Sequence, residues 1–166
     1  MVLKQLIVNN TFTHTFVSCA RLTYLWLRMK YTLEEEYEYD FRLIGISCHE
    51  KDYRICWGLN NGLRLSLAKE EGEIEVLIKK TNEFSKHALY SYFQEDTENE
   101  FTLLNNRGNS GYLVPERAHA DYLFMIKESY DVNLGELISN IKSIPFVLTA
   151  FEVKVGDLKS KENLLF

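Results

Sequence analysis

The stretch GYLVPERAHADYLFMI, from Gly111 to Ile126, places two apolar runs on either side of a proline and an acid. Pro115 has no amide hydrogen to donate to a neighbouring strand, so we expect it to close the first run, 112–114, as a short strand. The second run, 122–126, has no polar alternation, which is typical of a strand covered on both faces. The stretch therefore predicts a strand, a bend and a second strand.

The chain before this stretch predicts one helix. Ser47 followed by Glu50 matches a capping box, in which each side chain satisfies a free backbone amide at the start of a helix. Asn60 to Gly62 would end this helix in a left-handed conformation. Its apolar stripe would consist of Ile55, Cys56, Leu59 and Leu63.

Strand patterns flank that helix. Residues 41–47 fit either a strand or a tight turn at Gly45, and polar composition predicts loops at 69–72 and 105–111. Alternating or aromatic-rich patterns predict strands at 31–39, 73–80, 87–93 and 101–107.

A second helix is predicted near the end of the chain. Asn133 followed by Glu136 is typical of a helix start, and Pro145 ends the helix because the residue before a proline is driven out of the helical region. A long strand, 146–155, and a charged tail, either loose or docked, complete the chain. Grouped strands and two helices predict an α+β fold, a two-layer sandwich with a mainly antiparallel sheet of about five to six strands.

Composition and charge narrow the possible functions. The chain has 166 residues, of which 46% are hydrophobic, enough for the core of one domain. Its formal net charge of −5 disfavours nucleic-acid binding, since an acidic surface repels phosphates. No apolar run is long enough to span a membrane. The three cysteines form no CxxC pair and the histidines have no zinc spacing, so we expect a cytoplasmic protein without a disulfide framework, metal or cofactor.

The first 28 residues differ in composition from the rest. They contain three basic residues and no acid, whereas residues 29–166 hold 16 basic and 24 acidic residues, a net charge of −8. Three interpretations are open: an extension upstream of a true start at Met29, a secretion signal, or a helix at 17–29 docked on the domain. We favour a poorly ordered extension at 1–28, because polar residues interrupt the apolar region that a signal requires. A single domain would then comprise 29–166.

Glu116 and Asp121 form the most prominent acid pair in the chain. Two carboxylates that flank a pocket can serve as general acid and base when their surroundings separate their pKa values. Both residues also stand at strand boundaries, one after a strand-ending proline and one before a strand. We favour this structural role. His119 lies between them, but a Glu, a His and an Asp lack the fourth ligand of a zinc site.

Two further pairs are candidates for a site. Cys48 and His49 could supply a thiolate nucleophile, although such pairs usually assemble from distant segments. Tyr53 and Trp57, one helical turn apart, could line a groove or pack at the rim of the core. The sequence contains none of the motifs GxSxG, HExxH, GxGxxG or GxxxxGK[ST], so no catalytic residue is assigned.

LVPERAHADY resembles the signature Ile-Pro-Glu, three residues, Val-Asp-Tyr that gives the IPExxxVDY family of Bacteroidota proteins its name. Val114 and Ala120 stand where the signature has Ile and Val. The segments DFRLIGISCHEKDYRICW, IPFVLTAFEV and KSKENLLF are also similar to the family, so the resemblance extends over 29–166. The resemblance implies a start near Met29 and implies no reaction, cofactor or partner. The residues that match the signature, and that we consider a possible binding site, are Pro115, Glu116, Asp121 and Tyr122.

We therefore expect a small cytoplasmic protein that binds an unknown protein partner without catalysis. The alternative is an enzyme or small-ligand-binding protein that uses Glu116 and Asp121, with Tyr122 as a third candidate. Association with RNA through exposed Tyr90 and Tyr92 is a further hypothesis, which would require a basic patch beside them. The sequence predicts no oligomeric state.

Overall fold

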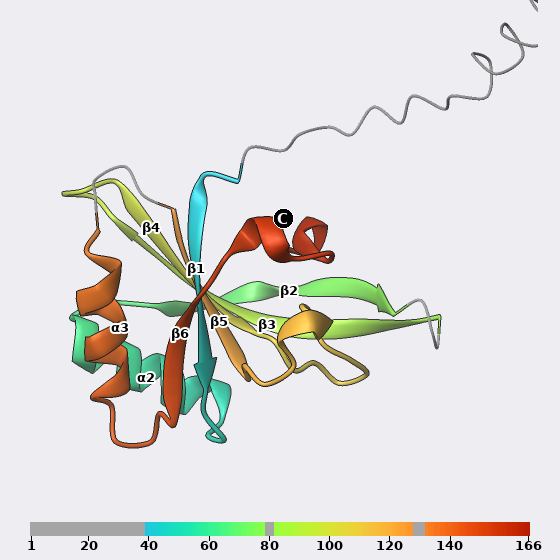
Figure 1. Ribbon diagram of the computed structural model, residues 1–166, viewed down its shortest axis with the longest axis horizontal. Coiled ribbons are helices and arrows are strands. Elements are labelled where there is room, and N and C mark those ends of the chain that lie inside the picture. Colours follow the sequence, from blue (N-terminus) through green and yellow to red (C-terminus); the bar gives the residue numbers. More distant parts are fainter. Residues whose placement is uncertain (1–38, 79–81, 128–131) are drawn as a thin grey trace, which may run out of the picture. The chain divides into compact units, whose positions relative to one another are not determined.

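The computed structural model describes residues 39–78, 82–127 and 132–166 (Figure 1), all within one compact unit, Tyr39–Phe166. The proposed extension at 1–28 lies outside the described residues. So does the strand predicted at 31–39, apart from Tyr39. The single domain predicted at 29–166 stays a prediction, because its first ten residues are not among those described.

Six strands of the described chain form one sheet in the order β2-β3-β4-β5-β1-β6, and all neighbouring strands pair antiparallel. Two α-helices of the described ranges accompany this sheet, α2 at Asp52–Leu63 and α3 at Leu134–Lys142. The predicted α+β class is therefore confirmed, with its antiparallel sheet and two helices. The strands are β1 Phe41–Ser47, β2 Ala68–Ile78, β3 Glu83–Gln94, β4 Asn99–Asn105, β5 Tyr122–Lys127 and β6 Thr149–Val153.

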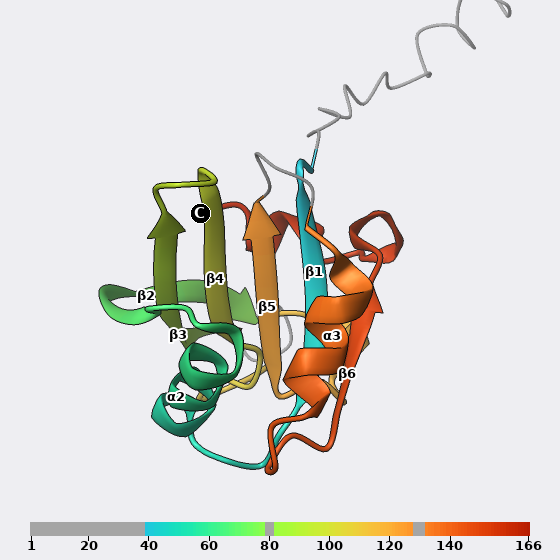
Figure 2. The same ribbon diagram turned by 90° about the vertical axis from the view of Figure 1, so that its left-hand side faces the viewer.

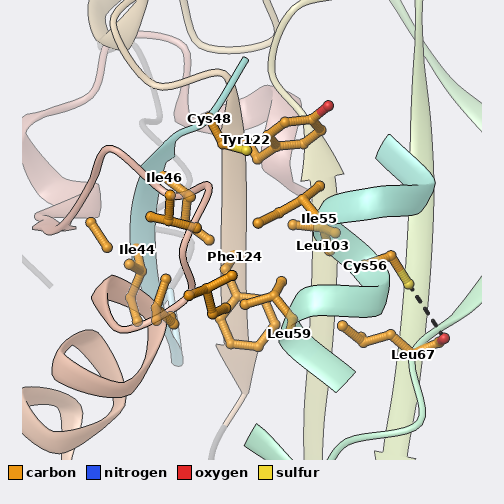
Figure 3. Close-up of a cluster of buried hydrophobic side chains, with 14 of the residues drawn as sticks. Ile44, Ile46, Cys48, Ile55, Cys56, Leu59, Leu67, Leu103, Tyr122 and Phe124 are labelled. Atoms are coloured by element: carbon orange, nitrogen blue, oxygen red, sulfur yellow. Dashed lines mark hydrogen bonds between the residues drawn. The ribbon is translucent and has the colours of Figure 1, made fainter. Parts of the chain in front are cut away.

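Both helices cover the same face of the sheet (Figure 2), because alternate residues of the central strands present apolar side chains to them. Ile44 and Ile46 of β1 and Phe124 of β5 point toward Ile55 and Leu59 of α2 (Figure 3). All five side chains are fully buried. Burial of each such side chain contributes about 1.5–3 kcal/mol, so this cluster adds substantially to stability on the helical face.

The opposite face of the sheet is covered without α-helices, by loops and by short 3₁₀ helices that include Val155–Asp157 and Lys161–Leu164. Leu43 and Leu123 point to this side, where they meet Leu113 and Val114 from the β4–β5 connection and Leu164 from the end of the chain. The segment 154–166 lies across the sheet from α2 and α3 (Figure 1). The tail is thus docked, which resolves the alternative left open by the sequence.

The predicted strand at 112–114 was wrong. Tyr112 makes only an isolated bridge with Arg107, and Pro115–Arg117 forms a short 3₁₀ helix. The amide of Val114 donates to Oδ1 of Asn106 at 2.8 Å rather than to a neighbouring strand. The buried side chain of Asn106 therefore accepts the amide hydrogen of Val114 that a neighbouring strand would accept in a sheet.

The predicted start of the first helix was also wrong, whereas the second was confirmed. Helix α2 follows Lys51, which makes no side-chain cap, and the hydroxyl of Ser47 instead donates to the carbonyl of His119 at 2.6 Å. For α3, Oδ1 of Asn133 accepts the amide of Glu136 at 3.2 Å, as the sequence pattern predicts.

Three other boundaries differ from their predictions. Helix α2 continues through Gly62 to a left-handed cap at Arg64, with φ of 58°. The polar segment 69–72 is part of β2, which has an irregular register between Lys69 and Glu73. Strand β6 is shorter than the predicted 146–155. Neither α2 nor α3, nor any other helix of the described ranges, is long and apolar enough to cross a membrane.

Candidate functional site

Asn106 organises the Pro115–Tyr122 segment, although its side chain is completely buried. Its amide group donates to the carbonyls of Arg117 and Ala120 at 3.0 and 2.7 Å, while its oxygen accepts from Val114. These bonds take up backbone groups that the bend would otherwise leave unpaired in the interior. The bend is thus held in shape by one amide side chain.

Glu116 connects this segment to the end of the chain. Its Oε2 accepts a 2.6 Å hydrogen bond from the hydroxyl of Ser160. Burial acts to raise the pKa of the carboxyl, but hydrogen bonds from the Ser160 hydroxyl and from the backbone amides of Glu116, Ser160 and Lys159 outweigh burial and hold the pKa below its ordinary value. Glu116 is therefore a charged hydrogen-bond acceptor for the docked tail.

Asp121 and Tyr122 connect the same segment to the start of α2. Oδ2 of Asp121 accepts the backbone amide of Cys48 at 2.9 Å, and the Tyr122 hydroxyl donates to the carbonyl of Glu50 at 2.6 Å. Burial, together with the negative charge of Asp52, raises the pKa of the Tyr122 phenol. Tyr122 therefore keeps its proton and acts as a donor to the β1–α2 connection.

The four predicted residues are divided between two cavities. Asp121 and Tyr122 line a cavity of about 490 Å³ beside the β1–α2 connection. Pro115 and Glu116 line a different one, of about 480 Å³, beside β2 and the tail. A mechanism that needs the Glu116 and Asp121 carboxylates in one pocket thus has no support in this geometry.

The Cys48–His49 pair lacks the features of an activated nucleophile. Burial is the main reason that the pKa of the Cys48 thiol is raised, so the thiolate is disfavoured. The His49 side chain is 82% exposed, and its Nδ1 lies 3.9 Å from Oδ2 of Asp121. His119 stacks on Phe151, with 4.8 Å between the ring centroids. Among the described residues, no group of three or more His, Cys, Asp or Glu side chains could hold a metal ion.

Helix α2 carries two exposed aromatic side chains. Tyr53 and Trp57 are 62% and 64% exposed on the outer side of the helix. The guanidinium of Arg54, on the same helix, lies over the ring of Phe146 at 5.3 Å. By contrast, Tyr90 is buried beneath the helices, so the expectation that it is exposed for base stacking was wrong.

Sequence reasoning missed Asn106 and Ser160. Asn106 belongs to a run of loop-forming residues, and nothing in its neighbours distinguishes a buried Asn from a solvated one. Ser160 follows Glu116 by 44 positions. The two uncharged polar residues of an otherwise charged and apolar tail, Ser160 and Asn163, were the one available signal.

Comparison of the chain with protein-family models, with curated proteins and with solved structures finds no match. The resemblance of LVPERAHADY to the IPExxxVDY signature therefore stays a prediction.

Proposed function

We propose that this protein is a non-catalytic accessory protein of the cytoplasm, and that it binds a protein partner through the outer face of α2. The observation that carries the proposal is the exposure of Tyr53 and Trp57, each more than 60% accessible and one helical turn apart. The free, buried thiols of Cys48 and Cys56 are consistent with a reducing compartment.

The hydrogen bonding of the polar candidates supports a role without catalysis. Glu116 and Tyr122 are both engaged with other parts of the chain, the first with Ser160 and the second with the carbonyl of Glu50. Asp121 accepts the amide of Cys48. Each of these three groups therefore already has a hydrogen-bond partner within the chain, which indicates a structural role.

The side chains of the α2 surface are those that dominate protein interfaces. Trp, Tyr and Arg are enriched among the residues whose truncation costs the most binding energy. Here Tyr53, Arg54 and Trp57 occupy successive outer positions of the helix, and the guanidinium of Arg54 lies over the ring of Phe146. A rigid helix face presents them with little conformational entropy to lose on binding.

Affinity purification from the native cells tests this proposal when three versions of the chain are compared. The wild type and a Phe93→Ser variant should recover the same protein, because Phe93 is 55% exposed on β3, away from α2. A Tyr53→Ser/Trp57→Ser variant should recover about tenfold less of it, as expected for loss of two central aromatic contacts.

The purified partner then gives a direct measurement. In a Trp26→Phe background, Trp57 is the one remaining tryptophan, so its emission should shift to the blue when the partner covers it. Equal recovery by all three versions, or a partner that leaves Trp57 emission unchanged, would overturn the proposal.

A further inference from the structure

Strand β2 is an edge of the sheet with one side open. Its partner is β3, and none of the other described strands pairs with it. Apart from β3, no described segment makes a backbone hydrogen bond to residues 72–77. At Gly72 an added Cβ would meet nothing within 4 Å. The backbone groups on the outer side of β2 are thus available to a further strand.

The two faces of this edge differ in chemistry. Glu73 and Glu75 are exposed on the face of the sheet that carries the helices, whereas Ile74 and Val76 point to the opposite face and are half-buried. Directly opposite side chains on adjacent strands are close enough to interact. A strand added outside β2 would therefore meet the carboxylates of Glu73 and Glu75, together with the exposed Leu77, on one face and apolar side chains on the other.

On the side toward β3, Glu75 already forms an ion pair with a lysine. Nζ of Lys86 on β3 lies 3.1 Å from Oε1 of Glu75, in the directly opposed register position. Glu73 and Glu75 both raise the pKa of Lys86, with Glu75 the larger cause. A basic residue on an added strand would face the same carboxylates from the outer side.

The apolar face has a second wall. A groove of about 600 Å³ runs along Gly72–Leu77, and the far side of this groove is formed by the end of the tail. Leu165 and Phe166 line it and are 43% and 61% exposed. Side chains entering from an added strand would cover Ile74 and Val76 together with these two residues.

From this geometry we propose that the outer edge of β2 binds an extended peptide in which basic and apolar residues alternate. The peptide adds a strand to the sheet through backbone hydrogen bonds, and its alternate side chains supply the specificity. Its Lys or Arg residues face Glu73 and Glu75, and its apolar residues enter the groove beside Phe166. This site is separate from the α2 surface, so either can fail without the other.

A fluorescent peptide that alternates Lys and Val over about seven residues, a typical strand length, is the probe for this site. Fluorescence anisotropy should show saturable binding, and hydrogen exchange should slow at the amides of Glu73–Leu77. A peptide of the same composition with all its Lys residues at one end should bind about tenfold more weakly, because it cannot place basic and apolar residues on separate faces.

Charge-reversal variants locate the site. Glu73→Lys/Glu75→Lys should weaken binding of the alternating peptide about tenfold, while Glu152→Lys on β6, the opposite edge of the sheet, should leave it unchanged. Circular dichroism checks that the double variant is folded, and Glu73→Gln/Glu75→Gln replaces it if it is not. Absence of binding, equal binding of both peptides, or an equal effect of Glu152→Lys would overturn the proposal, and the acidic residues would then serve to keep β2 unpaired.

Discussion

The hydroxyl of Ser160 donates a 2.6 Å hydrogen bond to Oε2 of Glu116, across 44 residues of sequence. A second bond joins the same two segments, from the side-chain amide of Asn163 to the carbonyl of Leu113 at 2.8 Å. Together they fasten the tail over Leu113 and Val114, whose side chains have no exposure to solvent. Glu116 thus helps to hold the tail that covers the second face of the sheet.

Replacement of Glu116 by Gln should lower the free energy of unfolding at neutral pH by about 0.5–1.5 kcal/mol, the usual value of one hydrogen bond. Because folding lowers the pKa of Glu116 from its ordinary value of 4.5, the ionised side chain stabilises the fold above pH 4.5. This stabilisation is lost as the pH falls through the pKa of the folded state. The difference between wild type and variant in urea unfolding should therefore shrink below pH 4.5. A Glu152→Gln control should show no such trend, and a constant difference at all pH values would contradict the assignment.

Asn106→Ala should be the most damaging of the polar substitutions in this segment. It would leave the amide of Val114 and the carbonyls of Arg117 and Ala120 without their partner in the interior. We expect a loss of about 3 kcal/mol in urea unfolding, since each buried unpaired group costs about 1–3 kcal/mol. The exposed Asn61→Ala should change stability by less than about 0.5 kcal/mol. Similar losses in the two variants would contradict the role given to Asn106.

Gly108→Ala should destabilise the loop that covers β3. An added Cβ would lie 2.7 Å from both Cε1 of His87 and the carbonyl oxygen of Lys86, too close for any ordinary contact. Overpacking of this kind costs about 1–3 kcal/mol. Gly72→Ala is the matched control, because its Cβ would meet nothing within 4 Å. Thermal melts should show a lower melting temperature for Gly108→Ala than for Gly72→Ala. Equal melting temperatures would show that the loop moves aside to accommodate the added methyl group.

Both thiols of the described chain should resist alkylation while the protein is folded. Cys48 and Cys56 are buried, and burial raises the pKa of each above its ordinary value of 9.0. In a Cys19→Ser background, mass spectrometry should detect iodoacetamide adducts at a rate that follows global unfolding as urea is added. Fast modification of Cys48 in the native protein would instead indicate an activated nucleophile.

The class of fold was predictable because the strongest patterns are local. The cap at Asn133 depends on neighbours within one helical turn, and α3 was found where this cap placed it. The failures involve distant partners. Ser47 was expected to cap a helix, but the carbonyl of His119, 72 residues away, takes its hydroxyl. A capping pattern carries no information about such competition.

The candidate site was predictable only in part for the same reason. The sequence singled out Pro115 to Tyr122 as a bend between apolar runs, and it is one. The separation of Glu116 from Asp121 depends on which distant segments bind each carboxylate. The tail binds one and the β1–α2 connection binds the other. Spacing along the chain could not distinguish this arrangement from a shared pocket.

Strand order has a consequence for how this protein is made. Strand β1 lies between β5 and β6, the last two strands of the described chain to be synthesised. Strands β2, β3 and β4 follow one another in the chain and are neighbours in the sheet, so they can pair as a meander before β5 and β6 are synthesised. The sheet can therefore be completed only after β6 has been synthesised, so the pairing of β1 depends on segments about 80 to 110 residues further along the chain.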